Sequence, residues 1–457
     1  METKLEKKYG LITAIAMVVG TVIGSGVFFK ATKVFNETKG DMTKSLLTVG
    51  IVGLIMLICS YVFSTLANKF EHVNGLVDYT EALLGKRYAY GMGWFLTIFY
   101  YPVLTQTLAW VSANYTCTLF KIENNDGAKL AIAAFYLIAG YTVNTLSPKL
   151  AGKFQVSATA IKLVPLVIMA VVGTICGLIN GTTISSFQAA TVDAATGSGS
   201  LLPAVCAFAF AYEGWVITTT INAELKNSKK NLPVALLIGA VIVVAVYMTY
   251  FIGLASVMSP NEIISAGGDL PIVAFTNLFG NPVFGTIVFV FIVISCLGTM
   301  NGLMLGCCRG MYSIAVRNQG PARKIFVQVD KATNMPTNSA VFGLILCGIW
   351  LLQWQLVMFN VNGVIPACLQ WEADEIVIVA LYAAYIPLFI AMMIKLKGEN
   401  IFKRFITPAL AVISSGFMCY SAYLAYKANG MVWSFLIICV VVVACGFFFY
   451  KDSRNEQ

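Results

Sequence analysis

Residues 20–29 read GTVIGSGVFF, and this stretch decides the fold because it interrupts the first long apolar run of the chain, residues 11–35. Gly20, Gly24 and Gly26 stand within seven positions, with Ser25 between the last two. Each glycine costs about 1 kcal/mol relative to alanine in a helix interior, so two half-helices joined by extended residues are expected. In a bilayer, such an unwound backbone is tolerated only where it faces protein or a water-filled cavity.

The amides that open the second half-helix point into this break, where the helix dipole favours an anion. The break is therefore a candidate binding site for a carboxylate. The three glycines also fit the small-residue spacing of a helix face that packs closely against a neighbour. Residues 20–29 alone do not decide between these two interpretations.

The composition indicates an all-α protein that crosses a membrane many times. The chain has 457 residues, of which 58% are hydrophobic and 11% are charged, against about 25% charged in soluble domains. At roughly 20 residues a span, this length predicts about a dozen helices with short loops. We expect twelve, near residues 10–36, 45–68, 88–120, 128–146, 153–180, 200–222, 232–258, 284–317, 338–355, 374–396, 404–427 and 429–450.

The positive charge is arranged to orient the chain in the membrane. With a cytoplasmic N-terminus, the inward segments hold 22 of the 30 Lys and Arg residues, the outward segments hold 7, and Lys162 lies inside a span. This distribution is the positive-inside bias, and it predicts a multi-pass protein of the cell membrane with both termini in the cytoplasm. The net charge of +9 is thus explained without a nucleic-acid partner.

Metal and redox sites are not expected. Most of the 12 cysteines fall inside apolar runs, with no C-x-x-C spacing, and they are interpreted as buried thiols. The single histidine, His72, falls in a predicted cytoplasmic loop, so a histidine-ligated metal is excluded. We expect neither a metal nor a cofactor.

The sixth predicted span has a second interruption. Pro203 stands near its start, and residues 210–215 read FAYEGW, which places a charge beside a glycine at mid-depth. Spans one and six are five apart, and a five-helix unit used twice is inverted in the membrane because five is odd. Interrupted segments at matching positions of two inverted halves indicate a transporter binding site. The second break therefore favours transport over simple packing.

Two ionisable side chains are predicted deep inside spans, Lys162 and Glu213. Such groups cost about 2.5–3.5 kcal/mol on insertion scales and are functional candidates. Lys162 is interpreted as a tether to carbonyls freed by the first break, a place where a fixed ammonium does the electrostatic work of a bound cation. Glu213 is interpreted as a cap on the second half of the sixth helix, with titration or a bond to a substrate cation as the alternatives.

Five motifs resemble the amino acid–polyamine–organocation superfamily, in particular bacterial relatives of the L-type amino acid transporters. The resemblance covers spans one to eight in register and weakens beyond them. The motifs are GTVIGSGVF at 20–28, VNTLSPKLAGKFQVSATAIKL at 143–163, FAYEGW at 210–215, INAELKNSKKNLP at 221–233 and GTMNGLMLGCCRGMYSIAVRNQGP at 298–321.

This resemblance implies the leucine-transporter fold, with an inverted-repeat transport core at residues 1–396. Helices one to five lie at 10–180, helices six to ten at 200–396, and two trailing helices with a cytoplasmic tail at 397–457. The implied function is sodium-independent transport of α-amino acids by exchange, around a site at the two discontinuous helices, one and six.

The resemblance also implies roles for individual residues. The amides of Ser25, Gly26 and Val27 take the substrate carboxylate, and Lys162 stands where sodium-independent members carry a lysine. Phe210 is the aromatic lid on the outer side. Backbone carbonyls take the α-ammonium, namely those of Ile23, Phe210, Ala211 and Glu213. The full set of implied substrate-binding residues is Ile23, Gly24, Ser25, Gly26, Val27, Phe210, Ala211, Tyr212 and Glu213.

The sequence departs from the L-type pattern in two places. Members linked to a heavy chain carry a cysteine after the third span, but residues 121–129 contain none. An obligate disulfide-linked partner is therefore not expected. L-type members have glycine where this chain has Glu213, which leaves side-chain specificity and proton coupling open.

Other functional classes fit the sequence less well. A channel needs a continuous polar stripe on several spans, and a membrane enzyme needs a catalytic cluster; neither pattern is present. A proton-coupled amino acid or amine permease is the alternative to exchange.

Overall fold

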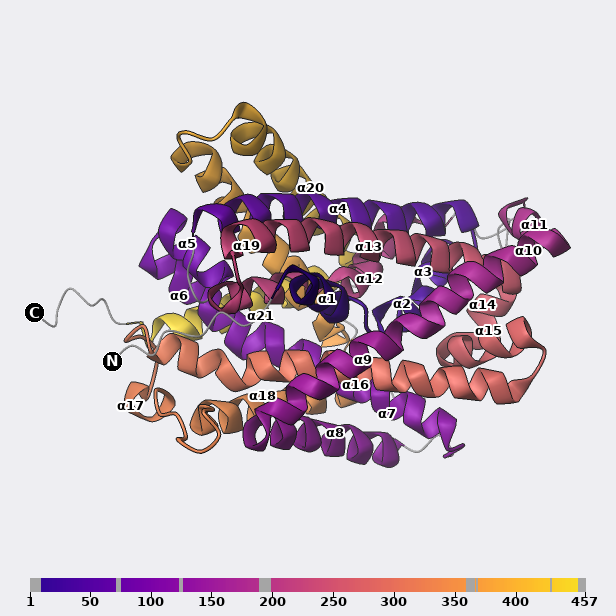
Figure 1. Ribbon diagram of the computed structural model, residues 1–457, viewed down its shortest axis with the longest axis horizontal. Coiled ribbons are helices and arrows are strands. Elements are labelled where there is room, and N and C mark those ends of the chain that lie inside the picture. Colours follow the sequence, from indigo (N-terminus) through magenta and orange to yellow (C-terminus); the bar gives the residue numbers. More distant parts are fainter. Residues whose placement is uncertain are drawn as a thin grey trace, which may run out of the picture.

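The computed structural model describes residues 10–70, 75–122, 126–188, 199–358, 366, 369–427 and 430–450, without the side chains of 220–224. His72 lies outside these ranges. The described chain is almost entirely helical (Figure 1). The α-helices are α1 (Leu11–Val22), α2 (Gly26–Phe29), α3 (Ala31–Glu37), α4 (Met42–Lys69), α5 (Leu76–Leu84), α6 (Lys86–Phe95), α7 (Tyr101–Leu119), α8 (Asp126–Leu146), α9 (Pro148–Ile168), α10 (Thr174–Asn180), α11 (Thr182–Gln188), α12 (Leu201–Phe208), α13 (Ser228–Val257), α14 (Pro260–Ala266), α15 (Leu270–Phe279), α16 (Pro282–Ala315), α17 (Arg323–Phe326), α18 (Thr337–Met358), α19 (Ala373–Lys395), α20 (Thr407–Lys427) and α21 (Met431–Phe447).

Shorter 3-10 and π-helical segments join or extend several of these α-helices. The π-helical segment η1 joins α6 to α7, and η2 joins α9 to α10, so each pair forms one long rod. The segments are η1 (Leu96–Tyr100), η2 (Met169–Gly173), η3 (Ala209–Tyr212), η4 (Trp215–Glu224), η5 (Gly267–Asp269) and η8 (Phe402–Ile406).

Ten helical stretches of the described chain are long and apolar enough to cross a membrane. They coincide with ten of the twelve predicted spans. The other two predicted spans correspond to the rod from α6 to α7, which is not among the ten, and to α21, which is shorter at 17 residues.

The first span breaks within the predicted stretch. Helix α1 ends at Val22, Ile23 is extended with ψ 104°, and α2 begins at Gly26. Only Lys30 separates α2 from α3, so the chain continues in nearly the same helical direction as far as Glu37.

The sixth span breaks at Glu213 and Gly214. Helix α12 tightens into the 3-10 segment η3, Glu213 is extended, and Gly214 has a φ of +102°, a conformation that favours glycine. The second half of this span, η4, is a 3-10 helix rather than an α-helix.

Helix α1 lies at the centre of the bundle, enclosed by its neighbours (Figure 1). Helices α4 and α13 run side by side, and α13 also packs on α1; α16 packs on α7, α9 and α18. The bundle has two ends, at the left and right of Figure 1. We call the left end, which holds α5 and α17, the near end, and the right end, which holds α11, α14 and α15, the far end.

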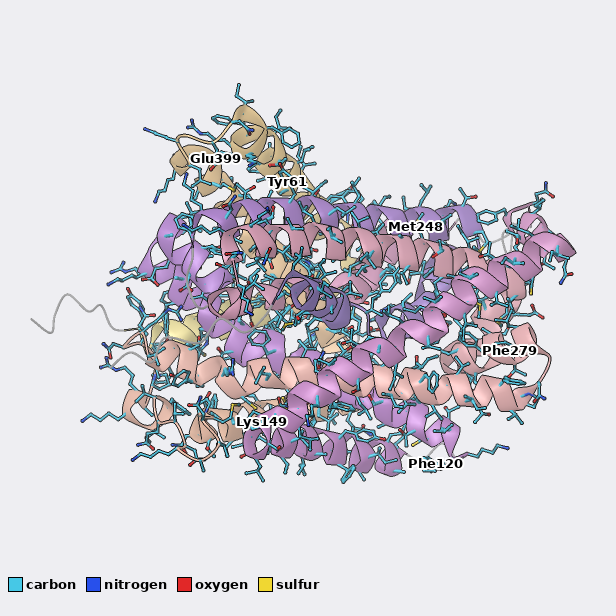
Figure 2. All side chains as sticks on the ribbon, in the orientation of Figure 1. Tyr61, Phe120, Lys149, Met248, Phe279 and Glu399 are labelled. Atoms are coloured by element: carbon cyan, nitrogen blue, oxygen red, sulfur yellow. The ribbon has the colours of Figure 1, made fainter. Side chains whose placement is uncertain are left out.

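The residues of predicted loops sort to these two ends. Figure 2 shows Glu399 and Lys149, from predicted inward segments, toward the near end, and Phe279, from a predicted outward loop, toward the far end. Between the ends, the side of the bundle is apolar. On α18, for example, Ile345, Ile349 and Leu352 are exposed by more than half, as expected for side chains that face lipid.

We predict that Gly343 is required for packing α18 against α16. An added Cβ at this position would lie 2.5 Å from the carbonyl oxygen of Cys307. Because that neighbour is backbone, Gly343→Ala should lower the free energy of unfolding by about 1–3 kcal/mol. Thermal unfolding of the purified protein in detergent measures the loss.

Gly348→Ala on the same helix is the matched control, because nothing lies within 4 Å of its added Cβ. This variant should unfold at or slightly above the wild-type temperature, since alanine is the better helix former. Equal melting temperatures for the two variants would contradict the packing argument.

Candidate functional site

The two helix breaks meet at a small cavity in the middle of the bundle. Its volume is about 20 Å³, room for about one water molecule. The first and sixth spans supply most of the wall, and α7 and α16 supply the rest. The lining residues are Thr21, Val22, Gly24, Ser25, Gly26, Leu104, Leu108, Phe210, Glu213, Gly214, Thr299 and Leu303.

The carbonyls freed at the end of α1 have side-chain partners from other helices. Lys162 on α9 donates from Nζ to the carbonyl of Gly20 at 2.6 Å and to Oγ1 of Thr299 at 3.0 Å. The hydroxyl of Tyr247 on α13 lies 3.2 Å from the carbonyl of Val22, and Oγ1 of Thr299 lies 3.4 Å from that of Ile23. These three carbonyls therefore have donors from within the protein, and the Tyr247 hydroxyl is shared between Val22 and the carbonyl of Ala211.

The amide side of the same break is different. Where the chain is described, the backbone N–H groups of Ser25, Gly26 and Val27 have no hydrogen-bond acceptor. Phe28 and Phe29 donate back to the carbonyl of Ser25, at 2.9 and 2.8 Å, and so complete the first turn of α2. Donors without acceptors beside satisfied carbonyls favour an anion in the break.

Glycine is required where the two breaks touch. An added Cβ at Gly26 would lie 2.6 Å from Cα of Ala211, and one at Gly24 would lie 2.7 Å from Oγ1 of Thr299. The glycine-packing interpretation thus also holds, because Gly20 packs in the same way against Thr159. The same stretch unwinds the helix and brings its neighbours close.

The structure brings together five of the nine predicted substrate-binding residues. Gly24, Ser25, Gly26, Phe210 and Glu213 line the cavity, whereas the other four, Ile23, Val27, Ala211 and Tyr212, do not line it.

The two residues beside the sixth-span break face α13 instead. The carbonyl of Ala211 is 3.0 Å from the hydroxyl of Tyr247. The ring of Tyr212 packs edge-on against the ring of Tyr247, with centroids 5.0 Å apart.

Glu213 is buried and bonded to the third span. The hydroxyl of Tyr100 in η1 donates to its Oε2 at 2.7 Å. The amide of Gly214 and the hydroxyl of Tyr382 also interact with this carboxylate. Contact with the Gly214 amide is compatible with the predicted capping role, while the two tyrosines add partners from η1 and α19.

A buried ion network lies next to Phe210, between the first span and the start of α19. The Nζ atom of Lys30 is 2.8 Å from Glu372, 2.9 Å from Asp374 and 3.4 Å from Glu375. Lys33 lies 2.7 Å from both Glu372 and Glu375. We call these five residues the Lys30 network; it joins the start of α19 to the first span.

The Lys30 network also contacts its surroundings on two sides. The Lys30 ammonium lies 5.8 Å from the ring centroid of Phe210 and 5.2 Å from that of Phe29. The hydroxyl of Tyr426 on α20 donates a hydrogen bond to Glu375. The network therefore covers the aromatic residue next to the cavity.

Burial of ionisable residues extends beyond Lys162 and Glu213, the two predicted deep inside spans. Lys30, Asp374 and Glu375 are 1%, 0% and 3% exposed. In the sequence they stand at the ends of apolar runs, where side chains usually reach water. The sequence signal for this burial is the acidic group at Glu372, Asp374 and Glu375, at the start of a span, which needs basic partners if it is buried.

On the opposite side of the cavity, an ion pair joins α5 to the end of α16. Nη2 of Arg317 is 2.6 Å from Oδ1 of Asp78, and its Nε is 3.7 Å from Glu81. The hydrogen bond from Lys395 to the carbonyl of Leu83, 2.7 Å long, holds the same short helix against α19. Polar contacts thus join helices on both sides of the cavity.

Comparison with known proteins gives a consistent picture. Residues 9–448 match the sequence profile of a family described as amino acid permease. The serine/threonine exchanger SteT of Bacillus subtilis is 27% identical over 399 residues, covering 87% of this chain and 85% of SteT. The human b(0,+)-type amino acid transporter 1 is 28% identical over 361 residues, covering 77% of this chain and 71% of the transporter.

A solved structure shows the same fold. The structure of MhsT in complex with L-phenylalanine matches with a TM-score of 0.56 at 14% identity, and the match covers 96% of this chain and 99% of MhsT. At this identity the likeness concerns the fold alone, which is that of the leucine transporter.

We predict that Glu372 makes the free energy of unfolding depend on pH. Burial by itself raises the pKa of Glu372, but the ammonium groups of Lys30 and Lys33 outweigh burial and hold the pKa well below its usual value. A carboxylate with a depressed pKa stabilises the folded state above its unfolded-state pKa of about 4.3 and loses that contribution as the pH falls. Acidification from pH 7 to pH 3 should therefore lower the melting temperature of the wild type more than that of Glu372→Gln.

The control is Glu399→Gln, which removes a carboxylate 3.9 Å from Lys69 outside the network. This variant should follow the wild-type dependence on pH. If Glu372→Gln keeps the full wild-type loss on acidification, the electrostatic role given to Glu372 is refuted.

Proposed function

The chain belongs to the amino acid permease family, part of the amino acid–polyamine–organocation superfamily, and from this premise we propose that it exchanges α-amino acids across a membrane without sodium. Support for exchange comes from SteT, whose name describes a serine/threonine exchanger. The observation that carries sodium independence is the buried Lys162 ammonium, 2.6 Å from the carbonyl of Gly20 at the first break. A fixed cation there removes the need for a bound one.

In the proposed binding mode, the substrate carboxylate accepts hydrogen bonds from the amides of Ser25, Gly26 and Val27. The donors without acceptors at this break support that role. The α-ammonium is bound by carbonyls of the two breaks. The carbonyl of Ala211 already accepts from Tyr247, so it would serve the substrate with its second lone pair.

The small cavity and the polar contacts on both sides of it support alternating access. A volume of about 20 Å³ is too small for an amino acid, so substrate enters only when the helices around the breaks move apart. We propose that the Lys30 network opens on one side of the site and the Arg317 ion pair on the other. Phe210 lies between the cavity and Lys30, which is the place for an aromatic lid.

The proposed architecture has twelve spans. Helices one to five (residues 10–180) and six to ten (200–396) form two inverted repeats in a transport core at 1–396, with two trailing helices and a tail at 397–457. The near end of the bundle is cytoplasmic, together with both termini, and the membrane is the cell membrane. This orientation rests on the positive-inside bias.

We propose that the carrier works without a disulfide-linked heavy chain, since residues 121–129 contain no cysteine.

Glu213 is the residue on which the alternative function depends. Its carboxylate lines the cavity, and it is bonded to Tyr100 at 2.7 Å. We propose that it holds the second break in shape and tunes the site, while carbonyls bind the ammonium. A proton-coupled amino acid or amine permease would instead use this carboxylate as the group that titrates.

We expect an exchange rate that does not depend on sodium. In proteoliposomes, replacing sodium by choline should leave the initial rate of amino acid uptake unchanged, because Lys162 supplies the positive charge at the break. Counterflow measured from pH 5 to 8 should be equally insensitive. A steep sodium dependence would refute the role of Lys162, and acid-stimulated net uptake that Glu213→Gln abolishes would establish the alternative function.

Gly26→Ala should abolish uptake while the protein still reaches the membrane. The added methyl group would lie 2.6 Å from Cα of Ala211, so the two breaks must separate and the amides move away from the carboxylate. Isothermal titration with the best amino acid substrate and uptake assays both measure the loss.

Gly50→Ala is the control, because its added Cβ would lie at an ordinary 3.7 Å from Sδ of Met248. It should transport like the wild type. Normal uptake by Gly26→Ala would count decisively against this binding site.

A further inference from the structure

An apolar groove opens in the side of the bundle between α6, α19, α20 and α21. Its volume is about 520 Å³, which is in the range of small-molecule binding sites. No lining side chain carries a charge, unlike the central cavity. The lining residues are Tyr88, Gly91, Met92, Phe95, Val379, Ala380, Ala383, Ala384, Cys419, Ala422, Tyr423, Tyr426, Val432, Phe435, Leu436, Cys439, Val443 and Phe447.

The groove has a buried floor and an exposed rim. Met92 and Phe95 on α6 and Ala422 on α20 are buried, whereas Tyr423 and Leu436 are 42% and 49% exposed. A narrow chain fits into this concave shape and reaches its floor. The face of another helix is too broad to do so. Polar groups that would fix the orientation of a water-soluble ligand are scarce in the lining.

The length and direction of the groove match those of a lipid tail. The lining extends along α21 from Val432 to Phe447, about 22 Å at 1.5 Å per residue. Helix α21 belongs to the bundle whose exposed sides are apolar, so the groove follows the direction of the helices through the hydrocarbon layer, which is about 30 Å thick. An extended acyl chain has this shape and this chemistry.

A basic residue marks the near end of the groove. The ring of Phe447 packs against those of Tyr90 and Tyr450, with centroids 6.0 and 6.2 Å away. The guanidinium of Arg87 lies 6.0 Å from the ring of Tyr450. A phosphate at this depth would be attracted by Arg87 and by the charge bias of the near end.

From these observations we infer that the groove binds one acyl chain of an anionic phospholipid, with the phosphate beside Arg87. The floor gives this lipid a route to the Lys30 network. Tyr426 lines the groove, and its hydroxyl donates to Glu375. An acyl chain packed on the Tyr426 ring holds that hydrogen bond in place and so stabilises the closed network. The consequence for uptake rests on the function proposed above; the lipid site itself does not.

Native mass spectrometry of the delipidated full-length protein, titrated with dioleoyl phosphatidylglycerol, tests the site. The wild type should retain one lipid. Ala383→Trp fills the groove with an indole from its exposed mouth and should weaken binding by about tenfold. Leu436→Gln on the rim gives a second, milder variant with the same direction of effect. Ile345→Trp on α18, a position 54% exposed outside the groove, is the control and should bind like the wild type.

Two further variants test the phosphate contact and the link to the Lys30 network separately. Arg87→Gln should weaken the binding of phosphatidylglycerol but leave the weaker binding of dioleoylglycerol, which has the same acyl chains and no phosphate, unchanged. Phosphatidylglycerol should raise the melting temperature of the wild type, and Tyr426→Phe should bind the lipid but lose most of that rise. Both readouts are independent of transport, so they stand even if no amino acid is taken up.

The inference fails if Ala383→Trp and Leu436→Gln retain lipid like the wild type. It also fails if Ala383→Trp changes the ratio of monomer to dimer with no change in lipid binding, because the groove is then an interface between copies of the chain. Equal effects of Arg87→Gln on both lipids would overturn the assignment of the phosphate, and an undiminished rise in melting temperature for Tyr426→Phe would overturn the link to Glu375.

Discussion

The structure depends on one constraint: inside a membrane, lipid offers a backbone N–H or C=O no hydrogen-bond partner, so the partner must come from the protein or from a cavity within it. The first span breaks this regularity at residues 23–25, and the surrounding helices restore it on one side only. Lys162, Tyr247 and Thr299, from α9, α13 and α16, bind the freed carbonyls. The N–H groups of residues 25–27 have no acceptor within the described part of the chain. This asymmetry turns a helix defect into a site for an anion, and it fixes the broken helix to three neighbours at once.

The two breaks also depend on each other sterically. Gly26 meets the backbone of Ala211, and Gly214, with its positive φ, meets the carbonyl of Thr21. Because these contacts are made by backbone, they do not yield by side-chain rotation. Movement at one break would therefore displace the other, which suits the alternating access proposed above.

Charge is concentrated where the proposed transport cycle separates the helices. The Lys30 network places two ammonium groups among three carboxylates, with most of them buried. Buried ion pairs add little net stability compared with apolar packing, because desolvation offsets the attraction. They are, however, specific in geometry, and hydration replaces their partners when the helices part. A network of this kind suits a contact that breaks when the helices part. Tyr426 links the network to the apolar groove between α6, α19, α20 and α21.

The sequence by itself determined the membrane class, both helix breaks and the two buried ionisable residues nearest them. Each follows from a local property: mean hydropathy, glycine spacing, or the cost of a charge within an apolar run. The tether from Lys162 to the first break was also predictable, because a freed carbonyl is the natural partner of a buried ammonium.

Only the tertiary structure decided which residues line the cavity. Within an unwound segment the direction of each side chain depends on a few dihedral angles and on the neighbouring helices, so Ser25 lines the cavity while Tyr212 packs against Tyr247. The pairing of Lys30 with Glu372 joins positions 342 residues apart. No local periodicity encodes such a contact; it exists because the fold brings the start of α19 over the first break, where each charge is stable only in the presence of the other.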